Sequence, residues 1–518
     1  MTMRTLVLTL AAVALGAAAS AQTAPATLRL SVDDAVKMAL DDNVDLRADR
    51  LDPQISDTRV AAAAGVFRPT IVTALNSNNQ LQPPSSFLVP AATKTDVVTT
   101  NAGLSQRLPR FGTSYSLGWT MAHTSSNSFL NSYNPVLQSG LSLNVSQPLI
   151  RDLFIDPARQ QLAVSRTNRD IADTRLRESL VHTTASVKSA YWNLVSARAT
   201  VDARRSALDL AQELVKQAED RLRVLIFDPT KRENWNVQIE AIDSPPVGTA
   251  AVDVDAAVTR ALAERADLQR ARKDIENAQI GVKYADNQRL PDVRLNASYA
   301  ANGLGGTQVL RAGGFPGTIV GPGQITPVGT VLSELFSRDF PTWSVGVSVS
   351  YPIGESSEQA NLARAKLERS QSDERLKSAQ ARAIQQVRDA AWKIEMNAKR
   401  IETTRAAREL AEQRLDAERK RYEVGMSTSF LVIQAQRDLA QTKNNELGAV
   451  LAYDLSLVDF DALQEAGPAG QSPAPASATA SAGSIGAPTA VPAVGQTSVA
   501  GATAGVPAAT PGSLFGRQ

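Results

Sequence analysis

Few side chains in this chain have the types and spacing that catalysis or metal binding requires. Its 518 residues include two histidines, His123 and His182, and no cysteine. Metal sites and acid–base pairs usually draw on several such side chains, and disulfides need cysteine. The glycines between residues 303 and 323 lie in a hydrophilic stretch that we expect to be a loop, not in a phosphate-binding strand–loop–helix motif. The sequence therefore predicts no enzyme activity, no cofactor and no metal.

The most informative short segment is RYEVGMSTSFLVI, residues 421–433, which separates two long helical patterns. Before it, apolar residues recur at alternating steps of three and four from Ile384 to Ile401, as along one seam of a coiled coil. Gly425 suits a tight turn whose backbone angles other residues resist. We therefore expect a hairpin of two antiparallel helices with residues 421–433 at its tip.

The composition excludes some classes of protein. The 54 basic and 52 acidic residues leave a formal charge of +2, which gives no sign of a nucleic-acid binder. Arg4, the apolar run to Leu15 and the sequence Ala-Ser-Ala at 19–21 predict a signal peptide over residues 1–21. No later apolar run approaches the roughly twenty residues of a membrane helix, so a membrane crossing would need strands. Residues 466–518, rich in Ala, Pro, Gly and Ser, predict a disordered tail.

The chain contains a tandem repeat. Residues 31–46 match residues 253–268 at an offset of about 222, and each predicts a short helix with a polar N-cap, Ser31 or Asp253. Strand-like alternation follows Pro69 and Pro291. The first repeat (22–229) has predicted strands within 67–149, including an extra hairpin at 102–119. The second (230–465) has a belt segment and then strands within 291–353.

A long helical pattern follows in each repeat. Residues 158–227 and 359–424 would each form a rod of about 100 Å at 1.5 Å per residue. Only the second repeat then has a hinge (421–433) and a returning helix (434–463). The alignment offset changes from about 200 to about 234, so the first repeat lacks about 34 residues, including its hinge. Either its helix runs straight and carries residues 234–243 to the wrong end, or it breaks near residues 213–218.

The tandem repeat and the YEVG hinge resemble the TolC-like outer-membrane channel proteins of multidrug efflux and type I secretion systems. The resemblance implies a mainly α fold with membrane β structure. Long antiparallel coiled-coil helices form a trimeric α-barrel tunnel across the periplasm, and each protomer adds four strands to an outer-membrane β-barrel. It also implies a homotrimer in the Gram-negative outer membrane, in contact with lipid, a periplasmic adaptor protein and an inner-membrane pump.

The hinge is the expected docking site at the periplasmic mouth, through Tyr422, Val424, Gly425, Met426 and Ser427. Ser427, Leu431 and Gln434 stand where the family can carry gating Arg and Asp residues, which argues against an electrostatic latch. Phe430, Leu431 and Ile433 would either form an apolar gate or pack the helices together at the turn.

The resulting prediction is a passive export conduit of a tripartite efflux pump or a type I secretion system. The alternatives are a periplasmic coiled-coil scaffold and a non-functional member of the family that lacks its first hairpin tip. Strands after both Pro69 and Pro291 argue against the scaffold, which has no need of them.

Overall fold

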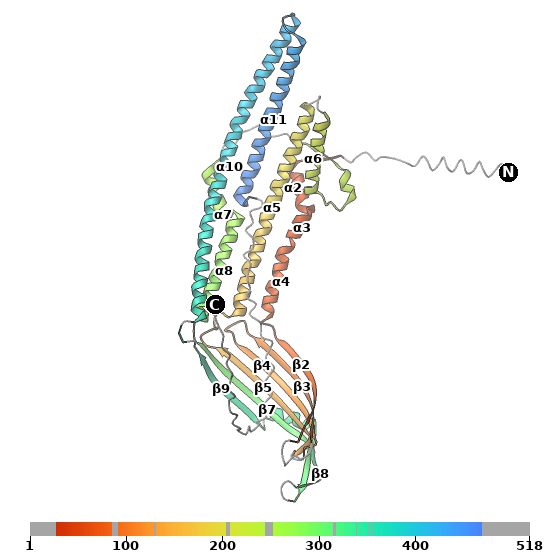
Figure 1. Ribbon diagram of the computed structural model, residues 1–518, viewed down its shortest axis with the longest axis vertical. Helices are drawn as coiled ribbons and strands as arrows, with labels where there is room; N and C mark the ends of the chain where they lie inside the picture. The colour runs from red at the N-terminus through yellow and green to blue at the C-terminus, as the bar shows by residue number, and fades with distance from the viewer. Residues whose placement is uncertain are drawn as a thin grey trace, which may run out of the picture. The chain divides into compact units, whose positions relative to one another are not determined.

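The computed structural model describes residues 27–84, 92–128, 131–203, 208–243, 252–313, 317–337, 339–351, 353–354 and 356–468. The predicted signal peptide and the predicted tail beyond residue 468 lie outside these residues. The described part consists of long helices that continue from one curved antiparallel sheet (Figure 1).

The sheet has six neighbouring long strands and one shorter strand. In spatial order they are β2 (Thr70–Gln82), β3 (Thr93–Arg107), β4 (Ser114–Ser126), β5 (Tyr133–Pro148), β7 (Asp292–Ala312) and β9 (Pro341–Ser350), with β8 (Thr318–Thr326) paired to the far part of β7. All neighbours are antiparallel. The extra hairpin predicted at 102–119 therefore belongs to the sheet, which corrects the four strands per chain that the resemblance implied.

The glycine-rich stretch after residue 303 is not the loop that we expected. Strand β7 continues to Ala312, β8 returns alongside it, and helix α9 (Val328–Ser337) follows. Glycine normally weakens a strand, but it also marks places where another backbone approaches closely. An added Cβ at Gly303 would lie 2.4 Å from the carbonyl oxygen of Val331 in α9. These glycines are thus packing positions under a helix.

The helices repeat in the same order in the two halves of the chain. The first repeat has α2 (Val32–Asp42), α3 (Val44–Asp49), α4 (Leu51–Gly65), α5 (Pro157–Ala203) and α6 (Leu208–Ile226); the second has α7 (Val254–Glu264), α8 (Ala266–Gln288), α10 (Ser357–Glu423) and α11 (Ser429–Glu465). The predicted N-caps are confirmed, because the Ser31 and Asp253 side chains each accept a backbone N–H of the first turn. None of the helices that the structure describes is both long and apolar enough to cross a membrane.

Two equivalent apolar cores hold the helices together. One surrounds Val187 of α5 and the other surrounds Val387 of α10, which correspond at the offset of 200 between the two long helices. Of the predicted seam, Val387, Ala391, Ile394 and Ile401 are buried. Burial of this seam confirms the coiled-coil pattern between α10 and α11.

The first repeat forms a shortened hairpin, so the straight-helix alternative is wrong. Helix α5 ends at Ala203 and α6 runs back against it from Leu208, which places the break about ten residues before the expected position at 213–218. The apolar face of α6, including Leu222 and Ile226, is buried in the core with α5 and Ile239. Because that packing fixes the register, the break does not depend on turn residues.

The shortened hairpin returns the chain to the middle of the helices. After the 3-10 turn Arg232–Asn236, strand β6 (Gln238–Ala241) pairs in parallel with β1 (Thr27–Leu30). The Tyr191 hydroxyl donates to the Leu30 carbonyl oxygen or to the Asp243 carboxylate, each 3.0 Å away. The segment 234–243 is therefore tied to α5 beside β1.

Candidate functional site

The sheet presents one apolar face and one polar face. The cross-strand row on the apolar face consists of Ile71, Leu104, Leu117, Leu143, Tyr299 and Trp343, one residue from each long strand. The adjacent row, on the polar face, consists of Thr70, Ser105, Ser116, Asn144, Ser298 and Ser344. A sheet with lipid on one side and a water-filled lumen on the other needs this alternation in every strand.

Hydrogen bonds between neighbouring strands organise the polar face. The Ser146 hydroxyl donates to the Asn296 side-chain oxygen at 2.8 Å, and the Asn296 amide donates to the Ser348 hydroxyl at 3.1 Å. The Ser298 and Ser344 hydroxyls lie 2.7 Å apart. On the apolar face of β9, Val345 and Val347 are exposed in the single chain. The polar face is therefore ordered by hydrogen bonds between strands, whereas the opposite face is mainly apolar near the helices.

Each outer strand of the sheet has one edge without a partner among the residues that the structure describes. β2 pairs only with β3, and β9 pairs only with β7. Every residue of β2 and β9 is exposed. A long free edge cannot be tolerated in lipid, because its backbone groups would lack hydrogen-bond partners.

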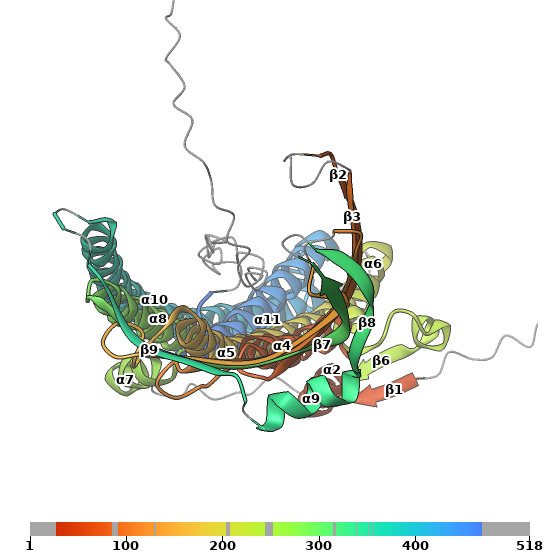
Figure 2. The ribbon, with the colours of Figure 1, turned by 90° about the horizontal axis from the view of Figure 1, so that it is seen from below.

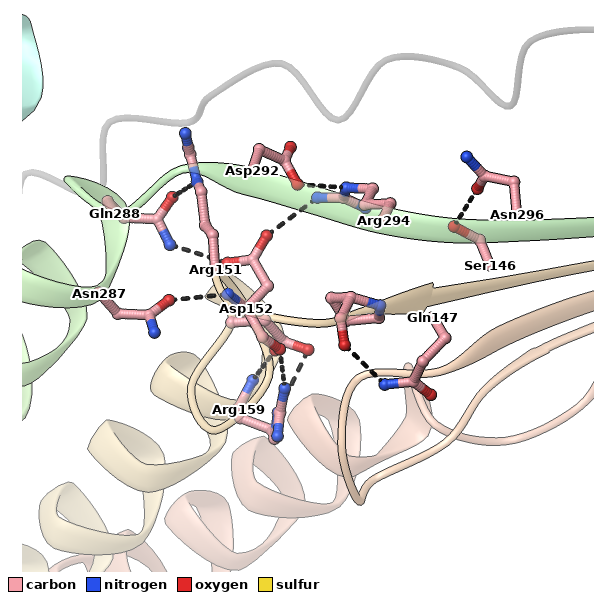
Figure 3. Close-up of polar contacts among 12 residues, drawn as sticks. Ser146, Gln147, Arg151, Asp152, Arg159, Asn287, Gln288, Asp292, Arg294 and Asn296 are labelled. Atoms are coloured by element: carbon pink, nitrogen blue, oxygen red, sulfur yellow. Dashed lines mark hydrogen bonds and ion pairs between the residues drawn. The ribbon is translucent and has the colours of Figure 1, made fainter. Parts of the chain in front are cut away.

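A polar joint connects the sheet to the helices (Figure 3). Asp152, in the turn between β5 and α5, has a positive φ of 64°. Its N–H donates to the Asn287 side-chain oxygen at 2.8 Å, and its carboxylate accepts from Gln288 at 2.8 Å and from Arg294 at 3.0 Å. Arg159 of α5 donates to the Asp152 carbonyl oxygen. One aspartate thus ties α8, β7 and α5 together where strands become helices.

The hinge between α10 and α11 ends the first helix with a Schellman motif. The Met426 N–H donates to the Arg421 carbonyl oxygen at 2.8 Å, and the Gly425 N–H donates to the Tyr422 carbonyl oxygen at 3.0 Å. Gly425 occupies the left-handed position of this motif with φ 77°, where glycine avoids the Cβ clash. The backbone angle expected at Gly425 from the sequence is therefore present.

Ser427 ties the hinge back to the end of α10. Its hydroxyl donates to the Glu418 carboxylate at 2.7 Å, and Arg421 donates to the other Glu418 oxygen at 3.1 Å. The Ser427 hydrogen bond, followed by the charges of Arg421 and Arg414, lowers the pKa of Glu418. Ser427, which stands where the family can carry an arginine, thus stabilises the turn within one chain.

The structure brings the predicted site residues together at one tip. Tyr422, Val424 and Met426 are exposed, Met426 by 79%. Phe430, Leu431 and Ile433 lie in the first turns of α11 and are also exposed in the single chain. An apolar set of side chains this exposed at the end of a hairpin is suited to contact another protein. Docking and gating remain predictions.

The hairpin of α10 and α11 extends well beyond that of α5 and α6 (Figure 1). Helix α10 has 67 residues against 47 in α5, and α11 has 37 against 19 in α6. Of the two hairpins, only the second carries the YEVG hinge.

Helices α5, α8 and α11 contain buried charged side chains. Arg270 of α8 contacts Glu178 of α5 at 3.0 Å, with both side chains largely buried. Asp454 of α11 is 3% exposed, and neither of its carboxylate oxygens has a hydrogen-bond partner. Desolvation raises the pKa of Asp454 to about 6. Among the described residues, no group of His, Asp and Glu has the arrangement of a metal site.

Sequence reasoning missed the joint at Asp152 and the burial of Asp454. The partners of Asp152 lie 135 to 142 residues further along the chain, so no local pattern marks them. Asp454 falls in a helix whose apolar spacing does not single it out. The only clue in the sequence was that Asp220 occupies the equivalent position in the first repeat. Asp220 is exposed in the shorter α6, so it does not indicate that Asp454 is buried.

Comparison with known proteins identifies the family. Residues 257–463 match the family model described as outer membrane efflux protein. The second repeat of the chain thus matches this outer membrane efflux protein family. The match covers the second repeat from α7 to α11, including the hinge, and confirms the resemblance to TolC-like channels. The protein is therefore an efflux channel component of the outer membrane.

Solved structures of two outer membrane channels and of a further membrane protein share the fold. The Campylobacter jejuni CmeC outer membrane channel has a TM-score of 0.55 at 12% identity, with 84% of this chain and 85% of that chain covered. The open state of the Neisseria gonorrhoeae MtrE outer membrane channel has a TM-score of 0.54 at 17% identity, with 84% and 89% covered. A membrane protein from Pseudomonas aeruginosa has a TM-score of 0.54 at 16% identity, with 84% and 90% covered. No curated protein matches the sequence.

Proposed function

We propose that this outer membrane efflux protein is a passive homotrimeric conduit, without enzyme activity, that spans the outer membrane and extends into the periplasm. The observation that carries the proposal is the two-faced sheet with two free edges, joined directly to the long helical hairpins. Three sheets side by side would enclose a polar lumen and expose the apolar face to lipid. A scaffold without a pore would need neither face.

The free edges are compatible with head-to-tail pairing between copies. The chain runs away from the helices in β2 and towards them in β9, so β2 of one copy would be antiparallel to β9 of the next. Ile71 on β2 and Val349 on β9 both lie on the apolar face, each one residue in from the strand end next to the helices. Pairing at this level keeps the apolar faces continuous around the ring.

The register within the sheet supports closure. Following the pairing from Ile71 across the six strands leads to Trp343, six residues before Val349. This offset corresponds to about 20 Å along the strands, and the six strands span about 24 Å across the sheet. If Ile71 and Val349 lie at one membrane level, the strands therefore tilt by about 40° from the barrel axis. Strands in closed barrels tilt by roughly 35–45°. Three copies of six strands would form a barrel of 18 strands.

The proposed partners are a periplasmic adaptor protein and an inner-membrane pump, because a passive conduit needs another component to supply energy. Adaptor docking would use the exposed hinge residues Tyr422, Val424 and Met426, held by the turn at Gly425 and Ser427. Since the first hairpin is short, the trimer would offer three such tips. Phe430, Leu431 and Ile433 would line the mouth.

Planar lipid bilayers test the conduit directly. We expect the purified full chain to insert and to give discrete conductance steps. We also expect SDS gel migration of the membrane fraction to change on heating, as for a stable β-sheet assembly. Failure to insert, with recovery of an extended water-soluble protein, would favour the scaffold and overturn the proposal.

A further inference from the structure

Helix α9 lies on the apolar face of the sheet. Gly303 and Gly305 alternate in phase with Tyr299 along β7, so they belong to that face. An added Cβ at Gly305 would lie 2.4 Å from Cγ2 of Val331, and one at Gly303 equally close to the Val331 carbonyl oxygen. Figure 2 shows α9 on the convex side of the curved sheet. The two glycines therefore let the helix rest directly on the outer surface.

The other side of α9 is uncovered and exposes one large apolar side chain, Phe336, among small residues. Val331 and Leu335 are buried against the sheet, whereas Phe336 is 77% exposed. Phe340, in the short segment that leads into β9, is exposed as well. Neighbouring exposed apolar side chains of this size can mark a contact surface.

Three polar side chains of α9 have local hydrogen-bond partners. The Ser333 hydroxyl donates to the Thr330 carbonyl oxygen at 2.7 Å, and the Ser337 hydroxyl donates to the Asp339 carboxylate or to the Glu334 carbonyl oxygen. The Glu334 carboxylate accepts the Leu304 N–H of β7 at 3.0 Å. Ser hydroxyls bonded locally and a carboxylate bonded to the sheet reduce the cost of an environment poor in water.

The position of α9 matches one boundary of the apolar band. From Val293 to Ala301, β7 spans about 26 Å, or about 20 Å along the membrane normal at a tilt near 40°. The apolar band of an outer-membrane sheet is about 25 Å tall. Helix α9, over Gly303 and Gly305, thus lies at the end of the band remote from the long helices.

We propose that α9 is a lipid-contacting helix, with Phe336 among the acyl chains of the outer leaflet at the boundary with the head groups. The inference rests on the proposed orientation of the sheet and adds an interaction surface to it. Its support is continuity: the uncovered side of α9 extends the same apolar face that carries Val345 and Val347. Its occupant is lipid, not a second copy of the chain.

Because the sequence contains no cysteine, a spin label can be attached to one introduced cysteine without removing any native one. We would label single variants of the full chain in phosphatidylethanolamine/phosphatidylglycerol vesicles and measure collisions with oxygen, which enriches in lipid, and with a water-soluble nickel chelate. The test variant is Phe336→Cys. Val347→Cys reports the apolar face of the sheet, Ser344→Cys the polar face, and Phe430→Cys the hinge.

We expect the label at residue 336 to collide preferentially with oxygen, at a shallower depth than the label at 347. High nickel access at 336 would overturn the inference by leaving α9 in water, and low access to both reagents would overturn it by placing α9 against a second protomer. The label at residue 347 tests the proposed conduit separately. High nickel access at 347 would reject the proposed orientation of the sheet, whereas high nickel access at 336 alone would reject only the lipid contact of α9.

A second arm uses the glycine contacts. Gly305→Val should displace α9 and raise nickel access at residue 336, whereas Gly346→Val, at a β9 glycine with open space around it, should not. Unchanged access in Gly305→Val would contradict the packing on which the inference depends.

Discussion

At the scale of single residues, Gly425 gives the sharpest prediction. Its φ of 77° is costly for residues with a Cβ, but no atom would lie within 4 Å of an added Cβ. A Gly425→Val substitution should therefore distort the turn at a cost of about 1–2 kcal/mol without a clash elsewhere. We expect transport in cells to fall to background while the trimer still inserts in the outer membrane.

The matched control is Gly448→Ala in the interior of α11, which also has open space around it but an ordinary φ. It should retain transport, because alanine favours a helix more than glycine does. Gly425→Asn should retain part of the activity, since asparagine tolerates the left-handed region. Loss of insertion in Gly425→Val would refute a role confined to the hinge.

Asp454 predicts a pH dependence of stability. Its pKa is about 6 in the folded chain against an ordinary value of 3.8, so the folded state holds the proton more tightly than the unfolded state. The contribution of Asp454 to stability is therefore most favourable near pH 4 and is lost as the pH rises through 6. Asp454→Asn should increase stability at pH 8 by at most about 3 kcal/mol and leave it nearly unchanged at pH 4.

Thermal unfolding of the detergent-solubilised protein between pH 4 and pH 8 checks this prediction. Asp220→Asn is the control, because Asp220 occupies the equivalent repeat position but is exposed beside Arg223. Equal pH profiles for Asp454→Asn and the parent would show that the carboxylate is solvated in the assembled protein.

Single residues also mark the limit of sequence reasoning. Gly425 was predictable because a Schellman motif is local and demands a left-handed residue. Asp152 was not, because its role depends on side chains more than a hundred residues away. Ser427 could be recognised as a departure from the family pattern, but its bond to Glu418 could not.

At the scale of elements, periodicity predicted the long helices and most of the strands because alternation and coiled-coil spacing are strong signals. It failed where glycines serve packing, as in β7 under α9, and where tertiary contacts set a boundary, as at the end of α5. The size of the gap in the first repeat could be read from the alignment, whereas the position of its turn depends on how α6 packs.

The short hairpin yields a prediction at this scale. A copy of residues 404–441 in place of residues 204–207 exchanges four residues for 38, a net gain of 34 that matches the gap in the alignment. It should give six equal tips per trimer and a lower single-channel conductance, because more helices surround the mouth. A flexible Gly/Ser insert of the same length is the control. Equal conductance in all three proteins would mean that the gap does not affect the mouth.

At the scale of the whole molecule, the β3–β4 hairpin should set the width of the pore. The hairpin adds two strands to each chain, and its removal leaves β2 antiparallel to β5, so the remaining four strands can still pair in order. The apolar row would then run from Ile71 to Leu143 directly. Joining Gln82 to Tyr133 by a short turn should therefore give a trimer of 12 strands instead of 18, with a barrel narrower by about a third.

Cryo-electron microscopy of both trimers in lipid nanodiscs would count the strands, and bilayer recordings would compare the conductances. We expect the deletion to lower the conductance, unless the periplasmic mouth is the narrower constriction. The graft at residues 204–207 distinguishes these cases, because it changes only the mouth. If the parent trimer shows 12 strands in lipid, the hairpin lies outside the barrel wall, and the continuous apolar row from Ile71 to Trp343 would lose its role as the lipid-facing surface.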